Sequence, residues 1–237
     1  MILFFVKTEL ISSFFKNVNP YIESRYILIS HNSDNEISSL EIKHMDKQII
    51  HWFAQNLNIK KGKGYSPLPI GIENLRYQTN GVLKDFNIQI PKQKKYYIAS
   101  SFSVVTNDKI RKKVNSVLSG NNNITTISAS NHKEYMLTLR DYMFNLCPEG
   151  NGHDTHRIWE SLLLRTIPIM VKNEFTQNLA TLNFPILLLN NWEDLNKISK
   201  TELKEIYKNE SKLKNFKDVV TFNYWKKTIN SKKISKS

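Results

Sequence analysis

Short apolar runs alternate with segments of helical period along most of this chain. Runs such as 25–30 (RYILIS) and 142–147 (YMFNLC) predict buried strands, since a strand covered on both faces is apolar throughout. Apolar residues at 158, 159, 162 and 163 have the spacing of a helix. The alternation of strands and helices favours an α/β fold with parallel sheets. The predicted strands are 2–6, 25–30, 49–53, 68–70, 97–102, 124–128, 142–147, 167–171 and 185–189, and the predicted helices are 9–15, 108–118, 132–139, 155–164, 176–182, 192–198, 202–214 and 219–229.

A polar stretch divides the chain into two parts. Residues 77–95 have few apolar positions and contain the breakers Asn80-Gly81 and Pro91, so this stretch is the best linker candidate. We therefore expect two α/β lobes, over 1–91 and 92–228, with a cleft between them. Residues 229–237 are expected to form a basic tail, disordered from 231 onward.

The stretch 146–164 (LCPEGNGHDTHRIWESLLL) joins a predicted strand to a predicted helix through a glycine loop. The first backbone N–H groups of a helix have no intrahelical partner and lie at the positive end of its dipole. A phosphate can accept hydrogen bonds from these groups where nothing bulky blocks its approach. Gly150 and Gly152 remove side chains at this place. A strand, a glycine loop and a helix start in this order are typical of an anion-binding site.

Charged side chains follow the two glycines. His156 and Arg157 add donors and positive charge at the helix start. Arg157, Glu160 and Ser161 lie at i, i+3 and i+4, so one face can present a guanidinium to phosphates and a carboxylate to ribose hydroxyls. Spacing alone leaves an alternative open, namely a common turn before a helix with Arg157 and Glu160 as a solvated ion pair.

Polar clusters follow the predicted strands of the first lobe, at 31–34 (HNSD), 55–56 (QN) and 71–74 (GIEN). In open α/β sheets ligands bind beyond the carboxyl ends of the strands, so these side chains are candidates for substrate contact. Each also has a simpler explanation. His31 can cap a strand or lie in the core, Asp34 can cap a helix, and Glu73 can be a solvated charge.

The chain is basic. Its 34 Lys and Arg residues against 21 Asp and Glu residues give a formal net charge of +13. This charge favours an anionic partner, such as nucleic acid, an anionic membrane face or a phosphorylated substrate. The excess is scattered apart from a few Lys clusters, and an Asn-, Ile- and Lys-rich composition contributes to it. Charge alone therefore does not choose among these partners.

Cysteine usage and the N-terminal residues limit the class of protein further. Cys147 is the single cysteine, which excludes an internal disulfide and a thiolate metal cluster. Its place in a predicted buried strand indicates a small apolar filler. The apolar run 1–6 stops at Lys7, too short for a signal peptide or a membrane span, so we expect a cytoplasmic protein.

The stretch 148–160 (PEGNGHDTHRIWE), followed by 166–169 (TIPI), resembles the C-terminal signature of exostosin-like glycosyltransferases. The likeness is strong over 142–171 and weaker at the upstream segments 31–34 (HNSD), 52–56 (WFAQN) and 69–74 (PIGIEN). One departure is Arg165, where that family often has glycine before the Ile-Pro strand. The resemblance implies the GT-B fold, which consists of two Rossmann-like lobes. A complete enzyme of this kind is usually longer, so we expect a reduced N-terminal lobe or missing upstream residues.

The same resemblance implies a glycosyltransferase that moves a sugar from a UDP- or GDP-linked donor to a glycan or lipid-linked acceptor. It implies inversion without a metal cofactor, with the acceptor on the N-terminal lobe and the nucleotide on the C-terminal lobe. Inversion needs a base from the N-terminal lobe, for which Asp34, Glu73 and His31 are candidates in that order. A peripheral contact with an anionic membrane is expected, and nucleic acid is not. The donor contacts are expected to be Gly150, Asn151, Gly152, Thr155, His156, Arg157 and Glu160.

Other functions remain open from the sequence. A fucosyltransferase-like enzyme with a GDP-sugar has a similar layout but Glu-Lys in place of His156-Arg157, and an inactive relative is a further alternative. His153, Asp154 and His156 are ligand types for a metal, although they lack the spacing of a helical His pair. A nucleic-acid-binding protein is the third class, with Tyr96-Tyr97 beside Lys94-Lys95 and a basic helix over 108–118.

Overall fold

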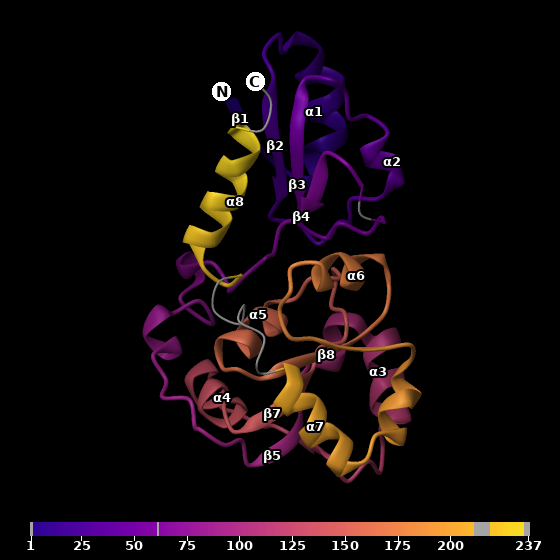
Figure 1. Cartoon of the computed structure of the whole chain (residues 1–237), viewed down its shortest axis with the longest axis vertical. Helices are drawn as coiled ribbons and strands as arrows, with labels where there is room; N and C mark the ends of the chain where they lie inside the picture. The colour runs from indigo at the N-terminus through magenta and orange to yellow at the C-terminus, as the bar shows by residue number, and fades with distance from the viewer. Residues whose placement is uncertain (1, 61, 211–218, 235–237) are drawn as a thin grey trace.

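The computed structural model is an α/β protein built on two parallel β-sheets, of four and five strands, that are flanked by helices (Figure 1). The structure describes residues 2–60, 62–210 and 219–234. We call the part around the four-stranded sheet the N-terminal lobe and the part around the five-stranded sheet the C-terminal lobe. The α/β class and the parallel sheets predicted from the alternation of strands and helices are confirmed.

The N-terminal sheet has the strand order β1-β2-β3-β4, and its strands are β1 (Ile2–Lys7), β2 (Tyr26–His31), β3 (Ile49–Ala54) and β4 (Tyr65–Pro67). Strand β2 is buried along almost its whole length, as its continuous apolar run predicts. The connections carry α1 (Ile11–Asn17) and α2 (Ser39–Ile42), with 3-10 turns at Thr8–Leu10 and Asn19–Tyr21. Helix α1 packs Ile11 and Phe14 against one face of this sheet.

The C-terminal sheet has the strand order β6-β5-β7-β8-β9, with all neighbours parallel. The chain passes outward from β5 to β6 and then returns to the other side of β5 with β7. Neighbouring crossovers therefore leave the sheet in opposite directions at β5 and β7, which is where open α/β sheets place their ligands. The strands are β5 (Tyr96–Ser100), β6 (Ile124–Thr126), β7 (Tyr142–Leu146), β8 (Ile167–Val171) and β9 (Leu187–Leu189).

Helices cover both faces of the C-terminal sheet around a core that contains Trp159, Phe144 and Phe175. The helices are α3 (Asp108–Val117), α4 (His132–Leu139), α5 (His156–Leu163), α6 (Glu174–Ala180) and α7 (Lys200–Glu210), with 3-10 turns at Leu75–Tyr77, Leu83–Phe86, Val104–Asn107 and Trp192–Lys197. Each helix in the described ranges is too short or too polar to span a membrane.

The last helix, α8 (Phe222–Ile234), returns to the N-terminal lobe and lies along its sheet (Figure 1). Ile229 packs there against Ile27, Ile29 and Phe53, on the side chains of β2 and β3 that α1 does not cover. The C-terminal end of the chain thus supplies a cover for the N-terminal sheet. The predicted tail 229–237 therefore begins with a residue, Ile229, that packs against the N-terminal lobe.

Several predicted elements differ from the observed ones. The strand predicted at 68–70 is observed as β4, at Tyr65–Pro67. It lies on the edge of the sheet, where a proline is tolerated although it has no backbone N–H. The segment predicted as a helix at 192–198 is a 3-10 helix. The predicted basic tail begins inside α8, so its residues 231–234 are helical and the predicted disorder there is wrong, while 235–237 lie outside the described residues. The end of the helix predicted at 202–214 also lies outside them.

Arg165, directly after α5, has a positive φ of 54°. This left-handed conformation at a helix end favours glycine, because a Cβ atom is strained there. Arg165 therefore adopts this conformation at a cost in backbone energy.

We expect Arg165→Gly to raise the free energy of unfolding by about 0.5–1 kcal/mol, since relief of strain exceeds the added freedom of the unfolded chain. Urea unfolding followed by circular dichroism measures the change. Arg165→Ala removes the same charge but keeps the Cβ atom, and it should not stabilise the protein. Equal stabilisation by both variants would attribute the effect to charge.

Candidate functional site

A cavity of about 940 Å³ lies between the two lobes, at the carboxyl ends of strands from both sheets. The N-terminal lobe and the linker contribute Asp34, Ile70 and residues 78–80 to its walls. The C-terminal lobe contributes the segments that follow β5, β6 and β7, on either side of the point where the strand order reverses. The predicted donor contacts all line this cavity: Gly150, Asn151, Gly152, Thr155, His156, Arg157 and Glu160.

The loop between β7 and α5 is held by its carbonyl groups. Asn107 donates from Nδ2 to the carbonyl oxygen of Gly150 at 2.8 Å. Arg111 donates from Nε to the carbonyl oxygen of Glu149 at 2.9 Å and approaches that of Pro148 at 3.5 Å. Side chains from the segment after β5 and from α3 therefore fix the loop from its carbonyl side.

Helix α5 begins without a side-chain cap. Its N-cap residue, Thr155, accepts no hydrogen bond from the first turn, although threonine commonly does so at this position. The Thr155 hydroxyl is buried and has no partner within the described part of the chain. The backbone N–H groups of the first turn and the Thr155 hydroxyl are therefore available at the positive end of the helix dipole, where an anion is stabilised.

Arg157 extends from the first turn of α5 toward the end of β5. Its Nη2 donates to the carbonyl oxygen of Ser101 at 3.1 Å, and its Nε is buried without a partner among the described residues. Glu160, one turn further along α5, is only 6% exposed. Arg157 and Glu160 do not form the solvated ion pair that their spacing allows. In the described structure Arg157 contacts Ser101, and Glu160 contacts His132.

Arg111 is a second cation of this cavity that the sequence analysis missed. It is 3% exposed, and Nη1 donates to the carbonyl oxygen of Ser103 at 2.6 Å. Burial, followed by the nearby charge of Arg157, lowers the pKa of Arg111 to about 10. A sequence signal existed, since Arg111 shares the buried face of α3 with Val114 and Leu118, where a charge is unusual.

Asp154 joins the two lobes at the cavity. Its carboxylate accepts the backbone N–H of Ile70 and the indole N–H of Trp159, each at 2.7 Å. Its own backbone N–H donates to Oδ1 of Asn56 at 2.7 Å. Burial raises the pKa of Asp154 to about 7 despite these donors. His156 makes a parallel contact, with Nδ1 donating to the carbonyl oxygen of Gly71 at 2.7 Å.

Gly152 has a reason for being glycine beyond phosphate access. A Cβ atom there would lie 2.8 Å from Nδ2 of Asn56 and 3.0 Å from the carbonyl oxygen of Asp34. Both atoms belong to the N-terminal lobe. The glycine therefore permits close packing between the lobes, which was not predicted from the sequence.

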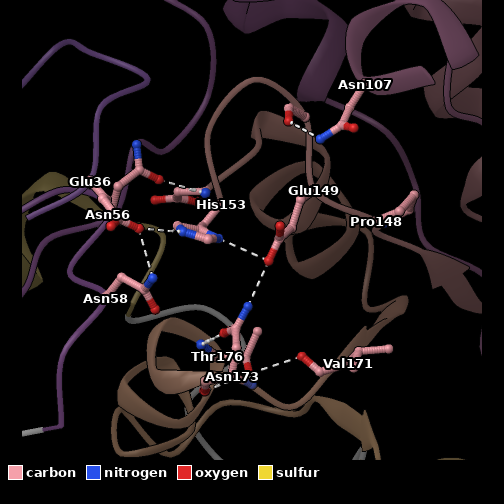
Figure 2. Close-up of polar contacts among 12 residues, drawn as sticks. Glu36, Asn56, Asn58, Asn107, Pro148, Glu149, His153, Val171, Asn173 and Thr176 are labelled. Atoms are coloured by element: carbon pink, nitrogen blue, oxygen red, sulfur yellow. Dashed lines mark hydrogen bonds and ion pairs between the residues drawn. The ribbon is translucent and has the colours of Figure 1, made fainter. Parts of the chain in front are cut away.

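His153 lies at the rim of this contact between two carboxylates (Figure 2). Its Nε2 is 3.0 Å from Glu36 of the N-terminal lobe, and its Nδ1 is 2.8 Å from Glu149. Glu149 also accepts a hydrogen bond from Nδ2 of Asn173 at 2.6 Å, and the His153 ring stacks on Phe175. The hydrogen bond to Glu149, followed by that to Glu36, raises the pKa of His153 to about 9.

The predicted base candidates separate in the structure. Asp34 is exposed and lines the cavity from the N-terminal lobe. His31 instead contacts the carbonyl oxygen of Pro69 at 2.9 Å through Nε2, and Glu73 accepts the backbone N–H of Asn80 at 2.7 Å. Neither His31 nor Glu73 is among the described residues that line the cavity.

The residues proposed as metal ligands are engaged elsewhere. Asp154 and His156 bind backbone groups of the N-terminal lobe, and His153 pairs with two glutamates. Within residues 2–60, 62–210 and 219–234, no three His, Cys, Asp or Glu side chains form a group that could hold a metal ion. Cys147 is buried as predicted, and burial raises the pKa of its thiol to about 12.

One residue of the aromatic and basic cluster at 94–97, Lys94, is taken up by contacts inside the protein. Lys94 is 8% exposed, and its Nζ donates to the carbonyl oxygens of Arg140 and Leu164 at 2.6 Å each. The ring of Tyr96 packs on Tyr142, with centroids 5.0 Å apart. These contacts fasten α4 and α5 to the sheet, while Lys95 and Tyr96 stay exposed.

Searches against protein-family models and curated proteins found no match to this chain.

We expect the pairing of His153 with Glu36 and Glu149 to make stability depend on pH. The folded pKa of about 9 exceeds the ordinary value of 6.5, so the stabilisation is complete below pH 6.5 and lost as pH rises through about 9. The contribution of His153 to the free energy of unfolding should fall by about 2 kcal/mol over this window, a figure discounted for partial exposure. Urea unfolding between pH 6 and pH 9.5 measures it. In His153→Gln this part of the slope should vanish, and an unchanged slope would contradict the assignment.

Proposed function

We propose that this protein is a glycosyltransferase of the GT-B type that uses a nucleotide-diphosphate sugar as donor. The observation that carries the proposal is the cavity between the lobes, lined by an uncapped helix start and by Arg111 and Arg157. In the described structure neither guanidinium is paired with a carboxylate, so an anion in the cavity would meet uncompensated positive charge. The resemblance of 148–160 to the exostosin-like signature agrees with this location.

The donor fits the cavity in one direction. Its diphosphate lies at the start of α5, near Thr155 and Arg157, where backbone donors and the helix dipole favour negative charge. Glu160, one turn along α5, accepts hydrogen bonds from the ribose hydroxyls. The nucleobase of the donor is then directed toward the loop 127–132 after β6, which also lines the cavity.

In the proposed reaction an acceptor hydroxyl attacks the anomeric carbon, while the bond from that carbon to the diphosphate oxygen breaks. The proton of the hydroxyl passes to the carboxylate of Asp34, which lines the cavity from the other lobe. Charge develops on the leaving diphosphate, and Arg157 with Arg111 stabilises it more in the transition state than in the substrate. The product has inverted configuration. A fucosyltransferase-like enzyme with a GDP-sugar remains the alternative within this reaction class.

UDP or GDP should raise the melting temperature of the protein. A ligand that binds only the folded state at about 100 times its dissociation constant adds about 2.7 kcal/mol, which corresponds to roughly 5 °C or more for a chain of this size. Differential scanning fluorimetry with a panel of nucleoside diphosphates measures the shift, and the nucleotide with the largest shift indicates the donor. Protection by DNA alone, with none by nucleotides, would favour a nucleic-acid-binding protein instead.

Arg157→Ala should weaken binding of that nucleoside diphosphate about 10- to 100-fold and abolish sugar transfer, because a charge-assisted contact with phosphate is lost. Arg165→Ala is the matched control, since it removes an arginine at the other end of α5 that does not line the cavity. Isothermal titration calorimetry compares the two variants. Equal affinities would remove the phosphate role of Arg157.

A further inference from the structure

A histidine between two carboxylates lies in the wall of the cavity, away from the start of α5. His132 is the first residue of α4, and its side chain is 5% exposed. Its Nε2 is 3.3 Å from Oε1 of Glu160, which is within hydrogen-bond distance. Its Nδ1 faces Oδ2 of Asp85 at 3.9 Å, too far for a hydrogen bond, and is buried without a partner among the described residues.

The imidazole has little freedom to turn. Its ring centroid lies 5.3 Å from that of Phe86 and 6.0 Å from that of Tyr135. Asp85 and Phe86 belong to the 3-10 turn Leu83–Phe86, in the segment that links the lobes. The linker, α4 and α5 therefore meet at His132. His132 is not among the nucleotide contacts predicted from the sequence.

The contact between His132 and Glu160 determines how the carboxylate is presented. The ring N–H donates to Oε1, since a carboxylate only accepts. Oε2 forms no hydrogen bond within the described structure, so it is available to a donor in the cavity. A buried carboxylate without the imidazole would lose both a donor and its fixed orientation.

We propose that His132 is a positioning residue that fixes Glu160, so that the cavity selects a ribonucleotide over its 2′-deoxy form. The inference rests on the proposed function, in which Glu160 binds the ribose. A carboxylate that is held in one orientation accepts hydrogen bonds from both ribose hydroxyls. A carboxylate that is free to rotate does not keep the geometry for both hydrogen bonds at once. Loss of the 2′-hydroxyl then leaves a buried acceptor unpaired, which disfavours the deoxynucleotide about tenfold or more.

Two substitutions of His132 separate positioning from packing. In His132→Gln the amide nitrogen can reach the place of ring Nε2 and donate to Glu160. In His132→Asn the shorter amide corresponds to Nδ1 and cannot reach it. Calorimetric titrations with UDP, 2′-deoxy-UDP, GDP, 2′-deoxy-GDP and pyrophosphate give the ratio of ribose to deoxyribose affinity for each variant. Circular dichroism melting controls for folding.

The wild-type protein should prefer the ribonucleotide about tenfold or more, and His132→Asn should bring the ratio close to one without changing pyrophosphate affinity. His132→Gln should keep most of the preference. A ratio that stays at the wild-type value in folded His132→Asn overturns the inference alone. If neither UDP nor GDP binds the wild-type protein, the proposed function fails and the inference fails with it.

Discussion

A buried carboxylate, that of Asp154, joins the two lobes at the cavity. Asp154 is 3% exposed, and a carboxylate removed from water costs several kcal/mol unless donors surround it. Both of its oxygens accept N–H groups here, one from Ile70 in the N-terminal lobe and one from Trp159 in α5. Because these donors lie in different lobes, the carboxylate fixes the distance between the ends of the two sheets. The contacts of His156 with Gly71 and of His153 with Glu36 join the lobes beside it.

The second constraint is positive charge without a carboxylate partner. Arg111 and Arg157 face the same cavity near the positive end of α5, and the charge of Arg157 disfavours the charged form of Arg111. In the described structure the hydrogen bonds that they donate go to backbone carbonyls, which do not neutralise the charge, and Nε of Arg157 has no partner. Such an arrangement is unfavourable for folding and favourable for an anionic ligand, a conflict that is common at functional sites.

The predicted donor contacts come together in the structure, whereas the predicted base candidates do not. Helix α4 and strand β8 have the predicted bounds, and all predicted donor contacts line the cavity, because loop chemistry and helical spacing fix their relative positions. The base candidates were harder to predict, since the direction of a loop side chain depends on what packs against it. Asp34 faces the cavity, whereas His31 and Glu73 bind neighbouring backbone groups.

The sequence by itself determined the α/β class, the parallel sheets and the glycine loop that opens α5, because periodicity and turn residues act over a few positions. Only the tertiary structure decided which groups meet across the cavity. Ile70 and Asp154 are 84 positions apart, and His153 reaches Glu36 across 117 positions. Contacts of this separation leave no periodic signal in the chain. They form because the two sheets, once folded, bring the ends of their strands together.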